Sequence, residues 1–394
     1  MHKTLNRQAG ELHLYVHIPF CVHKCAYCDF NSHVRQAPPW EHYRLALLAE
    51  LDHWSDQGQF AGRKLTTVFF GGGTPSLAPA TLIADVLQLA AQRFELAGDA
   101  EITLEANPGT VDTARFAAYR EAGINRLSIG VQSFDDAELL WLERIHNGSQ
   151  AMQAFERARN AGFDNISLDL MHGLPGQSMH GWLESLNAAI GLSPEHLSCY
   201  QLTIEAHTEL AQRHRRQPLA LPEDELALDF LRSTRSRLSD AGYQAYEVSN
   251  FSRPGRYCRH NDAYWLYHDY IGIGAGAAGK WDEDDGGITR YADIRSPEGY
   301  IKAGISDGRC INNSETLGLK KAAGEAVWLG LRRHDGIDQQ LFSKRFGQKI
   351  GEMFGEALRP WQRSGHLLIS EETIKLSDKG LGMADSIAVS VLTD

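Results

Sequence analysis

The stretch YVHIPFCVHKCAYCDF, residues 15–30, contains the feature from which the fold of this chain can be inferred. Three of the six cysteines, Cys21, Cys25 and Cys28, fall within it, and the other three lie far apart in the sequence. A C-x3-C-x2-C spacing allows three thiolates of one loop to face a single metal centre. Because the apolar run Leu12–Ile18 just before the loop predicts a buried strand, we expect the cysteines at the end of a first strand.

Two kinds of metal centre fit three thiolates. Structural zinc normally takes four protein ligands, and the nearby His17, His23 or His33 could supply a fourth. A [4Fe–4S] cluster held by three cysteines instead leaves one iron open for a small molecule. The scattered cysteines are most simply small buried hydrophobic residues in a reducing compartment, namely Cys199, Cys258 and Cys310.

The composition is that of a soluble globular protein. The 394 residues are 43% hydrophobic and 23% charged, and the formal charge is −11 from 39 basic and 50 acidic residues. This acidic balance argues against nucleic-acid binding, and the basic cluster Arg213–Arg216 is expected to be a solvated loop. No segment has the apolar length of a signal peptide or of a membrane span, so we expect a cytoplasmic protein.

From Leu12 to about Thr203 the sequence repeats a pattern of strand, turn and helix. Residues 41–54 and 81–94, for example, place apolar side chains at the three- and four-residue spacing of a helix packed on a sheet. Six such units predict an α/β fold, a partial (β/α)6 barrel of the TIM type, because a complete barrel has eight. The six expected strands are LHLYVHI, LTTVFF, EITLEA, RLSIGVQ, NISLDLM and HLSCYQLT.

The chain is expected to have three parts. The partial barrel takes residues 1–205, a connecting and barrel-extending region takes 206–311, and a smaller winged-helix-like α+β domain takes 312–394. The middle region begins with a polar loop and a helix, and the sheet resumes at YQAYEVSNF. From about Asn312 the pattern is helical, and it ends with a helix, two short strands and a helix. Weak local basic charge favours a packing or lid role over DNA binding.

Polar and glycine-rich residues stand near the C-terminal ends of the expected strands. After the cysteine loop these are GGGTPS at residues 71–76, then Glu105, Gln132 and Asp169. Parallel α/β folds gather their ligand sites at this edge. One shared site could therefore use all of these segments.

The segment CVHKCAYC resembles the C-x3-C-x-aromatic-C motif of the radical S-adenosyl-L-methionine (SAM) superfamily, whose [4Fe–4S] cluster binds and reductively cleaves SAM. Further segments narrow the resemblance to the oxygen-independent coproporphyrinogen III oxidase family of porphyrin metabolism and its relatives, the HemW-type heme chaperones. The similarity runs from about Leu12 to the C-terminus. The segments that carry it are LYVHIPFC, FFGGGTPS, LEANPGT, NRLSIGVQSF, RIH, DLMHGLPGQ, GLRRHDGI and LSDKGLGMADSI.

The resemblance implies that Cys21, Cys25 and Cys28 ligate the cluster. It also implies that the glycine-rich strand end receives the amino group of SAM on backbone oxygens, where glycine permits close approach. The implied SAM-binding residues are Tyr15, Tyr27, Gly72, Gly73, Thr74, Glu105, Gln132, Arg144 and Asp169. Taken singly, Glu105 and Asp169 could instead cap helices, and Arg144 could form a surface ion pair.

Two features separate the branches of this family. The oxidases carry a fourth cysteine two places after the third, where this chain has Phe30, and they carry a longer N-terminal arm than the eleven residues before Leu12. The resemblance therefore favours a heme chaperone without coproporphyrinogen oxidase activity. The alternatives are the oxidase itself, which decarboxylates its substrate oxidatively, and a structural protein stabilised by a cluster or by zinc.

The segment HNDAYW resembles the H-N-x-x-Y-W motif associated with heme binding in the chaperone branch. An imidazole can ligate heme iron, and aromatic side chains can cover the flat ring. His268 and Cys258 are rival iron ligands close by. The resemblance also suggests heme-acceptor proteins such as respiratory cytochromes as partners, dimerisation and peripheral membrane association. The implied heme-binding residues are His260, Asn261, Tyr264 and Trp265.

Overall fold

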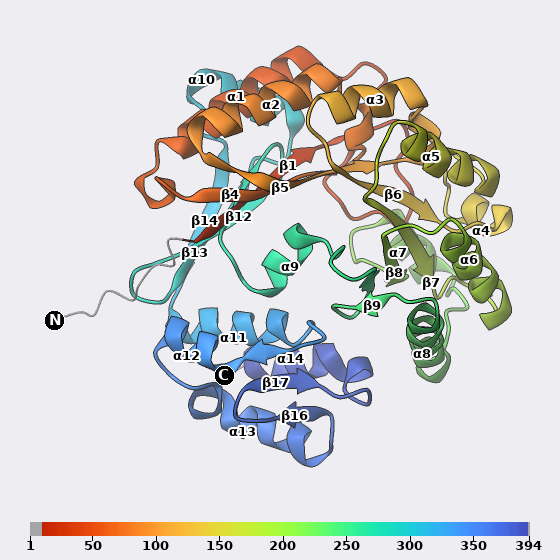
Figure 1. Ribbon diagram of the computed structural model, residues 1–394, viewed down its shortest axis with the longest axis vertical. Coiled ribbons are helices and arrows are strands. Elements are labelled where there is room, and N and C mark those ends of the chain that lie inside the picture. Colours follow the sequence, from red (N-terminus) through yellow and green to blue (C-terminus); the bar gives the residue numbers. More distant parts are fainter. Residues whose placement is uncertain (1–9, 393–394) are drawn as a thin grey trace.

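A curved, mostly parallel sheet forms the larger part of the molecule, and a small second domain packs beside it (Figure 1). The computed structural model describes residues 10–392. Within them the central strands are all parallel and lie in the order β11-β1-β4-β5-β6-β7-β8. Their bounds, in the same order, are Tyr270–Ile273, Glu11–Ile18, Lys64–Gly72, Glu95–Ala106, Arg126–Gln132, Ile166–His172 and His196–Gln201.

The sheet is an open partial barrel, as predicted, because antiparallel strands extend both edges and the two edges do not pair within residues 10–392. All six strands predicted for the barrel are present. A seventh parallel strand, β11, was not predicted, because its short sequence YIGI runs into a glycine-rich turn. The antiparallel strands are β12 (Ala278–Asp282), β13 (Ile288–Asp293), β14 (Ile311–Leu317), β10 (Asn250–Ser252) and β9 (Gln244–Ala245).

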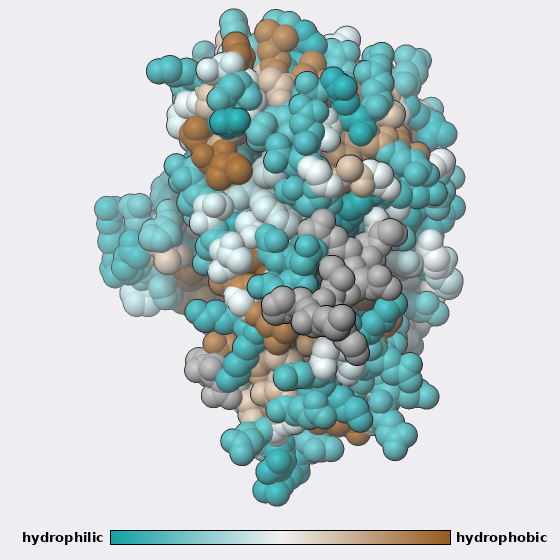
Figure 2. All heavy atoms as spheres, turned by 90° about the vertical axis from the view of Figure 1, so that its left-hand side faces the viewer, coloured by the Kyte–Doolittle hydropathy of each residue, from teal (hydrophilic) through white to brown (hydrophobic). Residues whose placement is uncertain are grey.

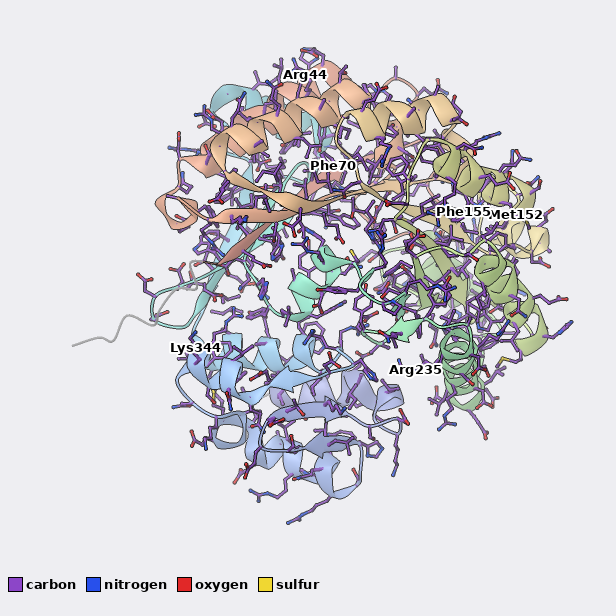
Figure 3. The ribbon with its side chains drawn as sticks, in the orientation of Figure 1. Arg44, Phe70, Met152, Phe155, Arg235 and Lys344 are labelled. Atoms are coloured by element: carbon purple, nitrogen blue, oxygen red, sulfur yellow. The ribbon has the colours of Figure 1, made fainter. Side chains whose placement is uncertain are left out.

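Helices cover the convex face of the sheet (Figure 1). The two helices predicted at residues 41–54 and 81–94 are α1 and α2. Phe70 of β4 is fully buried between the sheet and these helices, whereas Arg44 lies on the outer side of α1 (Figure 3). The helices of this domain are α1 (Trp40–Ser55), α2 (Ala80–Arg93), α3 (Thr113–Glu121), α4 (Asp136–Trp141), α5 (Gly148–Asn160), α6 (Met179–Gly191), α7 (Glu209–Arg216), α8 (Asp224–Asp240), α9 (Arg259–Trp265) and α10 (Pro297–Asp307).

The strands alternate apolar residues toward the helices with polar residues toward the concave face, as a period of two requires. In β1, Leu12, Leu14 and Val16 are buried under the helices, while His13 and Tyr15 face the interior. The interior is closed by α9, which lies across the concave side of the sheet (Figure 1). The barrel interior is therefore polar, and an inserted helix contacts its inward-facing side chains.

The C-terminal domain has the element order of a winged helix, as predicted. A helix, a strand, two helices and two strands follow one another, and the three strands form an antiparallel sheet. Its own apolar core includes Phe342, Phe354 and Ile374. The elements are α11 (Leu319–Gly330), β15 (Ile337–Asp338), α12 (Gln339–Phe346), α13 (Ile350–Arg363), β16 (Leu367–Ile369), β17 (Thr373–Leu376) and α14 (Ala384–Leu392).

Two local predictions were wrong. The helical pattern expected from about Asn312 begins only at Leu319, because residues 311–317 form the edge strand β14 of the large sheet. The expected loop at Arg213–Arg216 is the last turn of α7, where Arg213 pairs with Glu209 one turn earlier. Ion pairs at this four-residue spacing stabilise a helix in a polar segment.

Among the helices of residues 10–392, none combines the length and the hydropathy of a membrane-spanning segment. The face shown in Figure 2 is largely hydrophilic, with apolar residues in small separate patches.

Candidate functional site

The three clustered cysteines lie at the C-terminal end of β1, as predicted. Cys21 ends the short strand β2 (Phe20–Cys21), and the backbone N–H of Cys28 donates to the carbonyl of Cys25 at 3.1 Å, which closes the loop into a turn. Cys21 is buried, whereas Cys25 and Cys28 are half-buried. Burial raises the pKa of the Cys21 and Cys28 thiols. A bound cation would reverse this shift, since metal coordination deprotonates a thiol.

The three thiols do not gather as closely as the ligand atoms of one small ion. Within residues 10–392, the group of three His, Cys, Asp or Glu side chains whose ligand atoms all lie within 4.8 Å of one another is Glu11, His13 and His268, and the cysteines form no such group. Three cysteines from one loop can ligate three irons of a [4Fe–4S] cluster and leave the fourth iron open.

The glycine run at the end of β4 is needed because each glycine lies under a side chain of the first strand or its loop. A Cβ on Gly71 would lie 2.9 Å from the Tyr15 ring, and one on Gly73 would lie 2.9 Å from Cys21 Sγ. The Thr74 hydroxyl donates to the same sulfur at 3.4 Å. The glycine run therefore lets the cysteine loop pack closely against the end of β4, and it also leaves backbone atoms accessible to a ligand.

Arg144 joins the cysteine loop to β6. Its guanidinium donates to the Gly130 carbonyl at 2.7 Å, to the Tyr27 hydroxyl at 3.5 Å and to Cys25 Sγ at 3.7 Å. The Gln132 amide lies over the same glycine, 3.0 Å from where a Cβ of Gly130 would be. Arg144 is thus not part of a surface ion pair, and its Nε is buried without a hydrogen-bond partner.

Glu105 of β5 and Asp169 of β7 lie two strands apart, near enough for the charge of one to act on the other. Glu105 accepts from the Gly72 N–H at 3.1 Å, and Asp169 accepts from the hydroxyls of Ser128 at 2.9 Å and Ser167 at 3.0 Å. Both carboxylates are half-buried although they point inward. Neither caps the helix after its strand, since other residues, Asp112 and Ser178, cap α3 and α6.

Glu105 holds its proton unusually well. Burial, and then the nearby charge of Asp169, raise the pKa of Glu105 to about 8, and the Gly72 N–H opposes this only in part. Tyr15 lies close enough for the Glu105 charge to contribute to its own raised pKa. The neutral acid can donate a hydrogen bond, while the ionised form can accept two or more from a ligand.

Substituting Glu105→Gln should flatten the pH dependence of stability. The folded protein keeps the Glu105 proton up to about pH 8, whereas the unfolded chain releases it near pH 4.5. The stability from the protonated acid is therefore complete below pH 4.5 and is lost as the pH rises through 8. Urea unfolding of the cluster-free protein at about pH 5 and about pH 8 should show a smaller loss in the variant, by about 1 kcal/mol or more. Equal losses would contradict the raised pKa.

The predicted heme motif forms α9. His260 is buried, and both ring nitrogens are engaged, with Nδ1 2.6 Å from Thr67 Oγ1 and Nε2 3.0 Å from the Tyr264 hydroxyl. Its ring stacks on Phe69 at 5.1 Å. Asn261, Tyr264 and Trp265 are half-buried. In this arrangement His260 is a hydrogen-bonded core residue with no ring nitrogen free to bind iron.

The C-terminal domain holds the other side of α9. Arg333 donates to Asp262 at 2.7 Å, and the Arg332 guanidinium lies 4.9 Å from the centre of the Trp265 ring. The rival ligand Cys258 is fully buried and donates to Glu101, and burial raises the pKa of its thiol to about 12. Cys258 is therefore a protonated core residue. All three scattered cysteines are buried, as predicted.

Several interior residues were not found from the sequence. Glu101 accepts the backbone N–H groups of Arg259 and His260 at 3.0 Å and so fixes the start of α9. Arg126 is fully buried between the charges of Glu101 and Asp169. The sequence did carry one sign of these residues, since β1, β5 and β6 have polar residues at every second position. Such strands present one polar face, and apolar packing alone cannot cover it.

Comparisons with known proteins agree with this geometry. A family model described as "Radical SAM superfamily" matches residues 15–189, and one described as "HemN C-terminal domain" matches residues 317–381. The chain is 47% identical over 292 residues to the heme chaperone HemW of Escherichia coli (strain K12), covering 74% of this chain and 76% of the relative. It is 36% identical to a mitochondrial protein of Bos taurus, radical S-adenosyl methionine domain-containing protein 1, over 96% and 87% of the two chains.

Among solved structures, coproporphyrinogen III oxidase (HemN) from Escherichia coli, a radical SAM enzyme, superimposes with a TM-score of 0.82 at 25% sequence identity. The match covers 99% of this chain and 92% of that chain.

Proposed function

Because the chain belongs to the HemW family of heme chaperones within the radical SAM superfamily, we propose that it binds a [4Fe–4S] cluster, SAM and heme and delivers heme to acceptor proteins. The observation that carries the proposal is the meeting of Cys21, Thr74 and Arg144 around one loop at the C-terminal edge of the parallel sheet. A site at this edge is where a parallel α/β fold binds its cofactor.

The cluster would be held by Cys21, Cys25 and Cys28, and when bound it would supply an open iron for SAM and an electron that can cleave it. The Arg144 guanidinium and the Thr74 hydroxyl donate to two of the three sulfurs, and such hydrogen bonds tune the potential of a cluster. A reducing compartment such as the cytoplasm keeps the thiols available as ligands.

SAM would lie over the glycine run, with Glu105, Asp169, Gln132, Tyr15 and Tyr27 around it. The partial exposure of Glu105, Gln132 and Asp169 on an inward face supports this placement, since a fully packed interior would leave them buried. Carboxylates accept hydrogen bonds from ribose hydroxyls, and an amide can both donate and accept. Whether SAM is consumed or retained as a regulatory ligand does not alter these contacts.

Heme would bind through the α9 segment, His260, Asn261, Tyr264 and Trp265. Since both ring nitrogens of His260 are engaged, ligation of heme iron by His260 must break its hydrogen bond to Tyr264 or to Thr67. The C-terminal domain would control this step through Arg333 and Arg332, which hold α9 in the interior. Its role is then to pack against and restrain the heme segment, not to bind DNA.

Heme titration of two variants tests this step. Substituting His260→Ala should weaken heme binding and change the heme absorption spectrum. Substituting Tyr264→Phe keeps the aromatic ring but frees Nε2 of His260, so it should tighten binding by about 2- to 10-fold, because a hydrogen bond worth about 0.5–1.5 kcal/mol no longer competes. If the spectrum and affinity of both variants match those of the wild type, His260 is not the iron ligand.

The second candidate, coproporphyrinogen oxidation, is favoured by the close structural match to HemN. Phe30 argues against it, because it stands where the oxidases carry a fourth cysteine, and its side chain is 55% exposed beside the loop. The chaperone proposal includes respiratory cytochromes as heme acceptors. It also includes a homodimer and peripheral contact with a membrane.

A further inference from the structure

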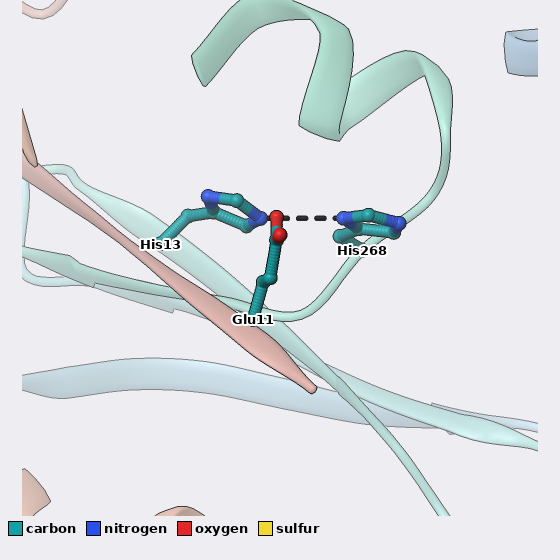
Figure 4. A group of neighbouring side chains, drawn as sticks. All are labelled: Glu11, His13 and His268. Carbon is teal, nitrogen blue, oxygen red and sulfur yellow. Dashed lines mark hydrogen bonds between the residues drawn. The ribbon is translucent and has the colours of Figure 1, made fainter. Parts of the chain in front are cut away.

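We propose that Glu11, His13 and His268 form a second metal site, which takes a single divalent transition-metal ion such as Zn²⁺. It lies at the N-terminal end of β1, whereas the cysteine loop lies at the C-terminal end of the same strand. One ligand atom from each of the three residues lies within 4.8 Å of the other two. Figure 4 shows the Glu11 carboxylate pointing toward the space between the two imidazole rings.

The separation of the imidazole nitrogens matches a metal site. His13 Nε2 and His268 Nδ1 lie 3.3 Å apart. These two nitrogens share a hydrogen bond in the structure. Two nitrogens bound to one tetrahedral zinc at about 2.0–2.1 Å are separated by about 3.3–3.4 Å, so an ion would replace the shared proton at nearly the same separation, with the rings turned so that both lone pairs point at it. The exposed Glu11 side chain can rotate to provide the carboxylate oxygen. Two histidines and a glutamate are a known zinc ligand set that leaves a fourth position for water.

The nearby cations Arg63 and Lys280 are both paired with Asp269, at 2.6 and 2.9 Å. The Glu11 carboxylate instead accepts a long hydrogen bond from the Thr66 hydroxyl at 3.5 Å, which a metal ion would replace.

The second ring nitrogen of His13 is hydrogen-bonded to the protein, as is usual for metal-bound histidines. Its Nδ1 lies 2.9 Å from Thr67 Oγ1, and the same hydroxyl lies 2.6 Å from Nδ1 of His260. With a metal on Nε2, the His13 proton must be on Nδ1 and donates to Thr67, which then donates to His260. His260 is left with its proton on Nε2, facing Tyr264.

His268 lies in the segment between α9 and β11. Metal binding would therefore link this segment to the start of β1. It would also fix the tautomer in which His260 donates from Nε2. This site would hold α9 inside the barrel whether or not the cysteine loop carries a cluster.

Equilibrium dialysis of the cluster-reconstituted protein against micromolar Zn²⁺, with zinc and iron measured separately, tests the site. The wild type should retain one zinc per chain with its iron unchanged. Substituting His268→Ala should weaken zinc binding at least about 100-fold, and Glu11→Gln about 10- to 100-fold, in line with the usual effect of disturbing a metal site. Circular dichroism of both variants should remain that of the wild type, since neither residue lies in the apolar core.

The matched control is His180→Ala. His180 and Glu184 form an exposed pair one turn apart on α6, 3.4 Å from each other, so they offer an imidazole and a carboxylate without a third ligand. This variant should bind zinc like the wild type. Wild-type protein that retains no zinc, equal retention by His268→Ala, or zinc uptake matched by loss of iron from the cysteines would each overturn the proposal. None of these results depends on heme binding or transfer, so the site can fail independently of the chaperone function.

Discussion

Substituting Cys25→Ala should abolish cluster assembly. After anaerobic reconstitution the wild type should hold about four irons per chain and show the broad visible absorption of a [4Fe–4S] cluster. Two thiolates cannot hold the cluster in place of three, and Cys25 is also the sulfur to which Arg144 donates. The variant should therefore retain almost no iron and lose the absorption band. SAM affinity should fall with it, because the open iron is one of the proposed SAM ligands.

The matched control is Cys199→Ala. Cys199 is equally reduced but is buried in β8, among the apolar residues between the sheet and the helices. Its variant should reconstitute about four irons. Iron retained by Cys25→Ala, or a single zinc bound tightly by the cysteines of the wild type, would contradict the assignment of the loop as a cluster site.

The second large effect concerns Arg126→Met, which should lower the free energy of unfolding by about 3–5 kcal/mol. Arg126 is fully buried at the start of β6, where burial tends to lower the pKa of its guanidinium, but the nearby acidic groups of Cys258, Glu101 and Asp169 raise it. Methionine fills a similar volume, so the loss comes from the two carboxylates that remain in the interior without a cation. Glu101 also fixes the start of α9, so this helix should become more accessible to protease or hydrogen exchange.

Urea unfolding followed by tryptophan fluorescence measures this loss. The control is Arg35→Met, because Arg35 and Glu298 form an exposed ion pair at 2.6 Å that should contribute at most about 1 kcal/mol. Equal stability losses in the two variants would show that Arg126 does not neutralise the interior carboxylates.

Sequence alone predicted those parts of the fold that local pattern determines. The six barrel strands are β-branched or apolar runs bounded by turns, so their period and length identify them. The strand at Tyr270–Ile273 was not predicted because four residues followed by glycines carry too little pattern. Its place beside β1 also depends on pairing with residues more than 250 positions away in the sequence. The edge strand at 311–317 escaped because INNSETL is polar and largely exposed, and pairing with β13 alone determines it.

The candidate site was predictable to a similar extent. The cysteine spacing and the glycine run located the loop. The structure brings Arg144 to it from the segment after α4, and Gln132, at the end of β6, lies beside Arg144 over Gly130. The sequence could not show that both nitrogens of His260 are engaged, since Thr67 lies 193 residues away and meets His260 only in the folded barrel. The same limit hid the group of Glu11, His13 and His268, whose members come from two strand ends far apart in the chain.

Heme transfer tests the central claim most directly. The cluster-reconstituted protein, loaded with one heme, is mixed with the apo form of a b-type cytochrome and followed by the absorption spectrum of the acceptor. The acceptor should gain heme, and Tyr264→Phe, which should bind heme more tightly, should release it more slowly than the wild type. Heme that stays on the protein, while the same preparation decarboxylates coproporphyrinogen III with SAM and reductant, would rule out the chaperone function and assign the chain to porphyrin synthesis.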